Sequence, residues 1–199
     1  MHLEGRNIGF RYNKSDWILR NFNISLKEGE VIGLIGPSGC GKTTLGRILA
    51  GYEIPQEGKV TLDNIPLPTT GIHPVQLINQ HPEKAVNPRW KMKKVLDEVK
   101  ELDEDILIAL GIEKEWLNRW PNELSGGELQ RFCVARALSV HTKFIIADEM
   151  TTMLDAITQA QIWNSVQEIA KKRNMGILVI SHEHNLLKRL CCRVIDLSI

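Results

Sequence analysis

The sequence lacks the features that mark a membrane span, a nucleic-acid partner or a disulfide framework. No run approaches the roughly 18 consecutive apolar residues that a span requires, and the N-terminus, MHLEGRNIGF, lacks the apolar core of a signal peptide. The 25 basic and 24 acidic residues leave a formal charge of +1, whereas a nucleic acid held by bulk charge usually requires a basic excess. The four cysteines form no C-x-x-C pair, which favours reduced, ordinary thiols over a metal or disulfide role. We therefore expect a soluble protein of the cell interior with no nucleic-acid partner.

What the sequence does contain is an alternation of strand and helix patterns. Its 199 residues predict one compact domain, or a core with one inserted subdomain. Apolar or alternating runs predict strands at 7–12, 18–26, 31–36, 58–63, 75–79, 143–148, 176–181 and 193–197, and helical spacing predicts helices at 43–52, 128–140, 157–173 and 184–190. The proline-rich stretch 64–74 is expected to be a loop. Strands that alternate with helices predict an α/β fold with a mainly parallel sheet.

Residues 84–124 have a different character. They combine helical periodicity and many charges with almost no strand signal. We expect an all-helical inserted subdomain there, with 1–83 and 125–199 forming the α/β core, which includes an antiparallel β subdomain.

The segment GPSGCGKTT at 36–44 fits the pattern G-x-x-x-x-G-K-[ST], after an apolar strand and before a helix. Its glycines let backbone N–H groups surround phosphates, and the helix N-terminus adds a positive dipole end. We expect Lys42 to reach the β- and γ-phosphates of a nucleotide and the Thr43 hydroxyl to ligate Mg²⁺. A structural turn without a nucleotide is the alternative, and the strand-and-helix context disfavours it. The residues expected at the nucleotide are Gly36, Pro37, Ser38, Gly39, Cys40, Gly41, Lys42, Thr43 and Thr44.

A second candidate site feature is FIIADE at 144–149. Four apolar residues bring Asp148 and Glu149 to the end of a buried strand. Asp148 suits a magnesium ligand, usually through water, and Glu149 suits a general base for an attacking water. Acidic residues end many strands, so the pair gains its weight from the phosphate loop that precedes it.

The phosphate loop and the two carboxylates are shared by kinases, GTPases, helicases and transporter motors. The stretch ELSGGELQR at 123–131 resembles the LSGGQ signature of ATP-binding cassette (ABC) proteins, with Glu128 in place of the usual glutamine. The matching residues are Leu124, Ser125, Gly126 and Gly127. In that family two ATPase domains face each other head to tail, and the signature of one closes over the γ-phosphate held by the other. The resemblance therefore implies a second phosphate nest, with the Ser125 hydroxyl, the Gly127 N–H and a helix N-terminus.

Four further positions follow the family pattern. Gln80 matches the glutamine that contacts magnesium or water and senses the membrane partner, and His182 matches the histidine that touches the γ-phosphate. Asp155 matches the aspartate that crosses the dimer interface. Tyr12 matches the aromatic residue that stacks on adenine, although a core strand aromatic is an open alternative. The resemblance covers essentially the whole chain and implies ATP and Mg²⁺ as cofactors, with Gln80, His182 and Glu149 as catalytic residues.

Three stretches resemble the ATPases of the peptide/nickel importers more closely: QHPEKAVNPRWKMKKVLDEV, RWPNELSGGELQR and DEMTTMLDAITQAQIW. The implied function is an ATP-hydrolysing motor subunit at the cytoplasmic face of the membrane. Its partners would be permease subunits and a second ATPase subunit, usually a different one. The implied substrates are peptides, nickel, cobalt or a metal–metallophore complex. Met150 departs from the pattern, in which a proline follows the catalytic glutamate.

Two rival functions remain. A non-transport ABC ATPase acting on DNA or ribosomes typically has two cassettes in one chain or a long coiled-coil insertion, whereas the insertion here is confined to 84–124. A phosphotransferase is disfavoured because the sequence has no acceptor-site feature and the signature has no role in such an enzyme.

Overall fold

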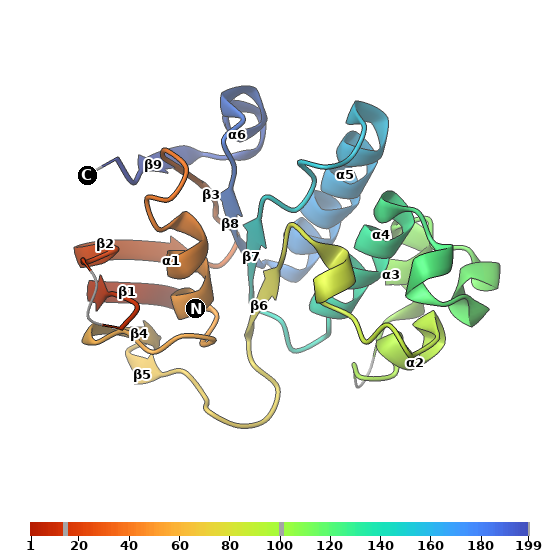
Figure 1. The fold of residues 1–199 in the computed structure, drawn as a ribbon, viewed down its shortest axis with the longest axis horizontal. Helices are drawn as coiled ribbons and strands as arrows, with labels where there is room; N and C mark the ends of the chain where they lie inside the picture. The colour runs from red at the N-terminus through yellow and green to blue at the C-terminus, as the bar shows by residue number, and fades with distance from the viewer. Residues whose placement is uncertain (14–15, 100–101, 199) are drawn as a thin grey trace.

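The computed structural model describes residues 1–13, 16–99 and 102–198, and these form two sheets flanked by helices (Figure 1). The antiparallel sheet has the order β2-β1-β4-β5, and the parallel sheet has the order β6-β7-β8-β3-β9. The strands are β1 (His2–Phe10), β2 (Leu19–Lys27), β3 (Val31–Ile35), β4 (Glu57–Leu62), β5 (Ile65–Pro66), β6 (Val75–Ile78), β7 (Phe144–Asp148), β8 (Gly176–Ile180) and β9 (Arg193–Asp196). The helices are α1 (Lys42–Leu49), α2 (Met92–Leu96), α3 (Glu104–Ala109), α4 (Gly126–Ala137), α5 (Ala156–Arg173) and α6 (His184–Leu190), with 3-10 turns η1 (Pro82–Lys84), η2 (Lys114–Asn118) and η3 (Pro121–Glu123).

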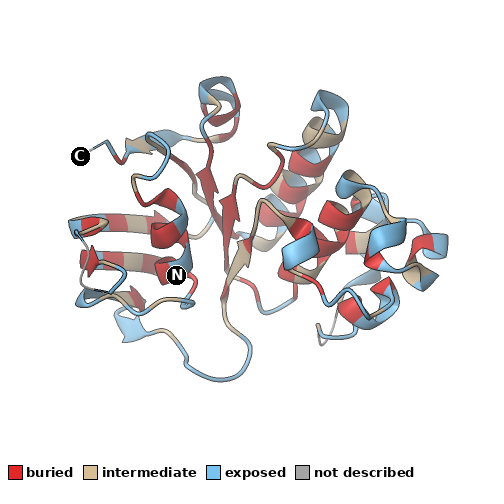
Figure 2. Cartoon of the chain, in the orientation of Figure 1, coloured by how far each residue is buried: buried red, intermediate tan, exposed pale blue. Residues whose placement is uncertain are grey.

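The parallel sheet forms the centre of the molecule because both of its faces are covered. All residues of β7 and β8 are buried, as expected for continuous apolar strands (Figure 2). Successive side chains point to opposite faces of a strand. Ile145 and Val179 accordingly belong to the cluster that includes α4 and α5, and Ile146 and Leu178 belong to the cluster that includes α1 and the antiparallel sheet. The sheet thus separates α1 from α4 (Figure 1).

The predicted α/β class is confirmed, and the predicted strands and helices are present, most of them with small shifts of their ends. The prediction of a loop over 64–74 was wrong at its start, where β5 pairs with β4. Asp63 and Asn64 have φ of 50° and 66°, which suits the tight type I′ turn of a two-residue hairpin. The first strand begins at His2 rather than at residue 7, and a register shift between Gly5 and Ile8 interrupts it near Asn7 (φ 52°).

In the described part of 84–124 the elements are α2, α3, η2 and η3, with no strand. The segment shares its apolar cluster with the central sheet: Met92, Ile106 and Trp116 belong to the cluster that contains Ile145. The boundary between a core and an inserted subdomain therefore stays a prediction. None of the helices that the structure describes is long and apolar enough to cross a membrane.

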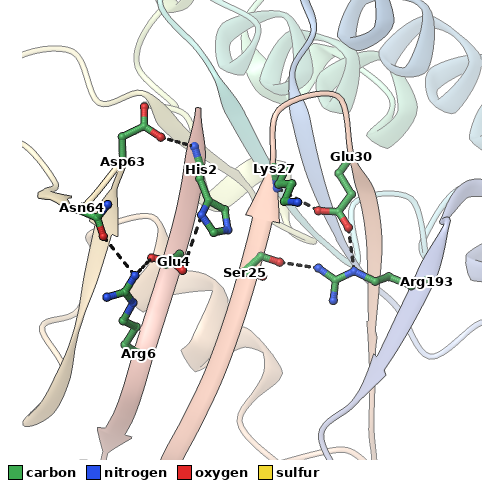
Figure 3. Close-up of polar contacts among 9 residues, drawn as sticks. All are labelled: His2, Glu4, Arg6, Ser25, Lys27, Glu30, Asp63, Asn64 and Arg193. Atoms are coloured by element: carbon green, nitrogen blue, oxygen red, sulfur yellow. Dashed lines mark hydrogen bonds and ion pairs between the residues drawn. The ribbon is translucent and has the colours of Figure 1, made fainter.

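An arginine on the last strand connects the two sheets (Figure 3). Arg193 of β9 donates from Nε to Glu30 Oε1 at 2.8 Å and from Nη2 to the Ser25 carbonyl of β2 at 2.6 Å. Glu30 Oε2 also accepts from the Lys27 N–H at 3.0 Å. Burial alone would raise the pKa of Glu30, but these hydrogen bonds and the charge of Arg193 together lower it. The contact joins the antiparallel sheet to the edge of the parallel one.

Candidate nucleotide site

The phosphate loop lies between β3 and α1, where the first amides of the helix have no side-chain cap. Gly41 is the N-cap of α1 with φ 101°, and a Cβ there would stand 2.7 Å from Ile18 Cγ2, so this position requires glycine. Gly39 has φ 82°, and no described atom lies within 4 Å of the place of a Cβ. The first turn of α1 also carries no acidic residue. Free amides and a positive dipole end at an open loop fit an anionic group such as a phosphate.

Lys42 is held across this loop. Its Nζ donates to the carbonyls of Gly36 at 2.8 Å and Pro37 at 2.9 Å, and the residue is 8% exposed. A cavity of about 360 Å³ lies in front of the loop. The residues that line it are Ile18, Ser38, Gly39, Gly41, Lys42, Thr43, Thr44, Gln80 and Glu149. The cavity thus brings the phosphate loop together with two of the three predicted catalytic residues.

The predicted magnesium ligands also lie close together. Asp148, at the end of β7, is 6% exposed, and burial raises its pKa while a hydrogen bond from Thr43 opposes the rise. Thr43, Gln80 and Asp148 line a second cavity of about 360 Å³, and Thr43 and Gln80 also line the first. A hydroxyl, an amide oxygen and a carboxylate are oxygen ligands of the kind that Mg²⁺ prefers, so the donor set fits this ion.

Glu149 combines a strained backbone with a polar partner. Its φ of 48° places it in the left-handed region, which costs a non-glycine residue about 1 kcal/mol and is often found at functional sites. The Glu149 N–H donates to the Ile180 carbonyl at 3.0 Å, which holds this turn against β8. His182 Nδ1 lies 3.4 Å from Glu149 Oε1. Met150, in place of the family's proline, is 3% exposed in the apolar cluster.

The signature residues start α4 and form their own cap. Ser125 is the N-cap: its Oγ accepts from the Glu128 N–H at 3.3 Å, and Glu128 Oε2 accepts from the Ser125 N–H at 2.7 Å. This reciprocal pair is a capping box. Gly126 has open space where a Cβ would stand, whereas at Gly127 a Cβ would meet Thr158 Cγ2 at 3.0 Å. Among the described residues that line the phosphate-loop cavity, none comes from 125–128. The two glycine segments of one chain therefore do not share a cavity.

Asp155 is the N-cap of α5. Its carboxylate accepts from the N–H groups of Ile157 and Thr158, both at 3.0 Å, and from Thr158 Oγ1 at 2.7 Å. These bonds, chiefly the one from the Thr158 side chain, lower the pKa of Asp155. The neighbouring Met153 and Ile157 are 67% and 72% exposed. Sequence reasoning missed this apolar pair, which suits a surface that a partner covers.

Tyr12 is not among the described residues that line the phosphate-loop cavity. It is 44% exposed and packs edge-on against Phe10, with 4.9 Å between the ring centroids. Ile18, which the sequence did not single out, lines the cavity, and its neighbour Trp17 lies under the Arg11 guanidinium at 4.7 Å. The only sequence signal for these residues is their place just before β2. Adenine stacking by Tyr12 stays a prediction.

Comparisons with known proteins agree with this geometry. A family model described as "ABC transporter" matches residues 19–152. The nickel import ATP-binding protein NikE of Escherichia coli (O6:K15:H31, strain 536 / UPEC) is 34% identical over 196 residues, which cover 89% of this chain and 73% of NikE. The putative oligopeptide transport ATP-binding protein YkfD of Bacillus subtilis (strain 168) is also 34% identical over 196 residues, covering 86% of this chain and 58% of YkfD. The dimeric structure of MJ0796, a bacterial ABC transporter cassette, superposes with a TM-score of 0.82 at 25% identity and covers 98% of this chain and 94% of that one.

A parallel sheet with a glycine-rich phosphate loop after β3 and a carboxylate pair at the end of β7, with β8 between these two strands, defines a P-loop nucleotide-hydrolase fold. Within that class, the chain belongs to the ABC transporter family.

Proposed function

We propose that the chain is the ATP-binding and ATP-hydrolysing motor subunit of an ABC importer of the peptide/nickel group. It works in a head-to-tail pair with a second ATPase subunit. The observation that carries this proposal is that the phosphate loop and the signature segment of one chain lie in separate places. The cavity beside Lys42 has a general base but no signature, and the signature at 125–128 opens elsewhere. Two chains placed head to tail complete both sites.

In this proposal each residue has a defined task. The amides at the start of α1 and the Lys42 ammonium hold the phosphates of ATP, since both present positive charge to the loop. Glu149 accepts a proton from the attacking water, and His182 orients that carboxylate by its contact with Oε1. Thr43, Gln80 and Asp148 would hold Mg²⁺, which would neutralise charge on the β- and γ-phosphates. Ser125 and Gly127 would contact the γ-phosphate of the partner's ATP.

The partners and the substrate class follow from the relatives. NikE is named for nickel import and YkfD for oligopeptide transport. We infer that the chain works at the cytoplasmic face of the membrane, bound to permease subunits that handle a peptide, nickel, cobalt or a metallophore complex. The second ATPase subunit is a sister chain or a second copy of this one.

A complementation experiment tests the composite site. A Lys42→Ala chain has a disabled phosphate loop and an intact signature. A Ser125→Arg chain has an intact phosphate loop and a disabled signature. Each alone should hydrolyse ATP about 100-fold more slowly than the wild type, because each lacks one group that stabilises the transition state. If the pair is two copies of this chain, mixing them should restore one working site per pair. If the second subunit is a sister chain, each variant paired with that sister should keep one working site. High activity of either variant alone, at a dilution where light scattering shows only monomer, would refute the proposal.

A further inference from the structure

Helix α4 holds the segment 79–85 through three side chains on one of its faces. Gln130 Nε2 donates to the Asn79 carbonyl at 3.3 Å, Cys133 Sγ to the Pro82 carbonyl at 3.8 Å, and Arg136 Nη2 to the Ala85 carbonyl at 2.6 Å. Each donor is separated from its acceptor by 51 residues. We call Gln130, Cys133 and Arg136 the donor row.

The common separation shows that the two segments run alongside each other in a fixed register. Side chains three positions apart lie on the same face of a helix, and here they meet carbonyls that are also three positions apart. Burial raises the pKa of the Cys133 thiol to about 11, so the thiol keeps its proton near neutral pH and can donate. All three acceptors are backbone carbonyls rather than side chains. The donor row therefore fixes the backbone path of 79–85 independently of the conformations of its side chains.

Gln130 contributes at a cost. It is 1% exposed, and its Oε1 has no hydrogen-bond partner among the residues that the structure describes. An unsatisfied buried acceptor costs about 1–3 kcal/mol, and an apolar side chain of similar volume would avoid this cost. Reversing the amide would turn its oxygen toward the Asn79 carbonyl. Methionine is an apolar side chain of similar volume. Compared with methionine, the only interaction that the Gln130 amide adds among the described residues is its hydrogen bond to the Asn79 carbonyl.

The segment 79–85 and α4 each lead to a different phosphate site. Gln80 lines the cavity of this chain's own phosphate loop, whereas Ser125 and Gly127 stand at the N-terminus of α4. We propose that the donor row makes α4 and 79–85 move as one unit, so that closure of the signature on the partner's ATP repositions Gln80 in this chain's own site. This inference rests on the proposed head-to-tail pair. The donor row acts as a positioning element, since its side chains reach the site only through 79–85.

Amide hydrogen exchange can test this coupling in the full chain with its ATPase partner. The reference is Glu149→Gln, which removes the proton-accepting carboxylate and lets bound ATP persist. ATP should slow exchange both at 125–130 and at 79–85. Adding Gln130→Met or Arg136→Met should leave the protection at 125–130 and lower that at 79–85 by about fivefold, the effect of roughly one hydrogen bond.

Arg131→Met is the matched control. Arg136 binds Glu98 Oε2 as well as the Ala85 carbonyl. Arg131 also lies on α4 and also has two partners, but these are the Leu110 carbonyl and Gln161 Oε1, away from 79–85. It should behave as the reference does. Retained protection of 79–85 in both donor-row variants, or an equal loss in Arg131→Met, would overturn the coupling.

A stability measurement separates positioning from a purely structural role. Gln130→Met, with Glu149 intact, should melt at or above the wild-type temperature because the orphaned oxygen is gone, while ATP turnover falls. A fall in melting temperature with a parallel loss of protection at both segments would instead assign a structural role and overturn the proposal. If Gln130→Met does not fold, hydrogen exchange of Arg136→Met in the Glu149→Gln background decides the outcome: lowered protection at 79–85 alone supports the proposal, and lowered protection at both segments overturns it. If ATP protects neither segment in the reference, the head-to-tail pair itself fails; if it protects 125–130 alone, only the coupling fails.

Discussion

Asp148 shows how a site residue can lower stability. Its carboxylate is 6% exposed, and burial, helped by the charge of Glu149, raises its pKa against the opposing Thr43 hydrogen bond and Lys42 charge. Between the ordinary and the raised value, the folded chain holds more protons than the unfolded chain. The free energy of unfolding therefore falls as pH rises through that window.

Asp148→Asn should accordingly remove this pH dependence and raise the melting temperature at pH 7, because a buried charge disappears. Mg²⁺-dependent ATP hydrolysis should fall about 100-fold because the carboxylate proposed to hold Mg²⁺ is lost. Melting curves at several pH values and steady-state turnover measure both effects. A variant that is less stable at pH 7 than the wild type would contradict the argument.

Glu128 has a structural task that its place in the signature does not reveal. Its carboxylate caps α4 through the Ser125 N–H but also places a negative charge beside the serine proposed to bind the partner's γ-phosphate. Glu128→Gln keeps an oxygen for the cap and removes the charge. We expect half-maximal turnover at a several-fold lower ATP concentration, since a charge at a helix N-terminus typically contributes about 0.3–1 kcal/mol.

Glu128→Ala is the control for that substitution. It removes the cap as well as the charge, so it should lower the free energy of unfolding by about 1 kcal/mol. An unchanged ATP dependence in Glu128→Gln would show that the carboxylate does not affect the partner's phosphate.

At the scale of elements, we propose that the surface beside Gln80 docks a helix of a permease subunit. Gln80, His81 and Lys84 line the second cavity together with Tyr52, which is 62% exposed. The segment that follows Gln80, HPEKAVNPRW, ends in Arg89 and Trp90, so the sequence predicts both as part of this surface, with Trp90 packing on its own subdomain as the alternative. Trp90, however, is half-buried against the apolar cluster and lies under Lys94 Nζ at 4.4 Å, so its substitution would also disturb packing.

Arg89 is exposed and gives the cleaner test. Arg89→Ser should lower permease-stimulated ATP turnover and transport by about fivefold to tenfold, the effect of roughly 1 kcal/mol or more at an interface. Basal ATP binding of the isolated subunit should stay unchanged. Normal transport and normal assembly with the permease would locate the docking surface elsewhere.

The elements differ in how well the sequence predicts them, and the reason is physical. β3, β7 and β8 are evident because burial on both faces demands an uninterrupted apolar run. β5 is only two residues long and depends on the Asp63–Asn64 turn, so it is too short to show the alternating pattern that predicts a strand. Within the site, the phosphate loop and the carboxylates follow from local motifs. The cap made by Glu128 follows the local pattern S-x-x-E of a capping box, which sequence reasoning missed. The donor row on α4 joins side chains to backbone 51 residues away, and such contacts leave no pattern in one sequence.

At the scale of the whole molecule, the contact between Arg193 and Glu30 connects the sheets. The lowered pKa of Glu30 means that its stabilising contribution is present above its ordinary value near 4.5 and is lost as pH falls through the lower folded value. Glu30→Gln should lower the free energy of unfolding at pH 7 by about 1 kcal/mol. The difference from the wild type should shrink in acid. Urea unfolding at pH 7 and at lower pH measures this, and a constant difference would mean that the charge of Glu30 is irrelevant.

The strand order also has a consequence for folding during synthesis on the ribosome. β3, which carries the phosphate loop, pairs in the parallel sheet with β8 and β9, the last two strands of the described chain. A growing chain therefore exposes β3 without its neighbours until residues 176–180 have emerged, a delay on the order of ten seconds at ordinary rates of synthesis. Nascent chains that stop short of β8 lack the strand that positions their phosphate loop. We therefore expect incomplete copies that end before β8 to bind nucleotide poorly.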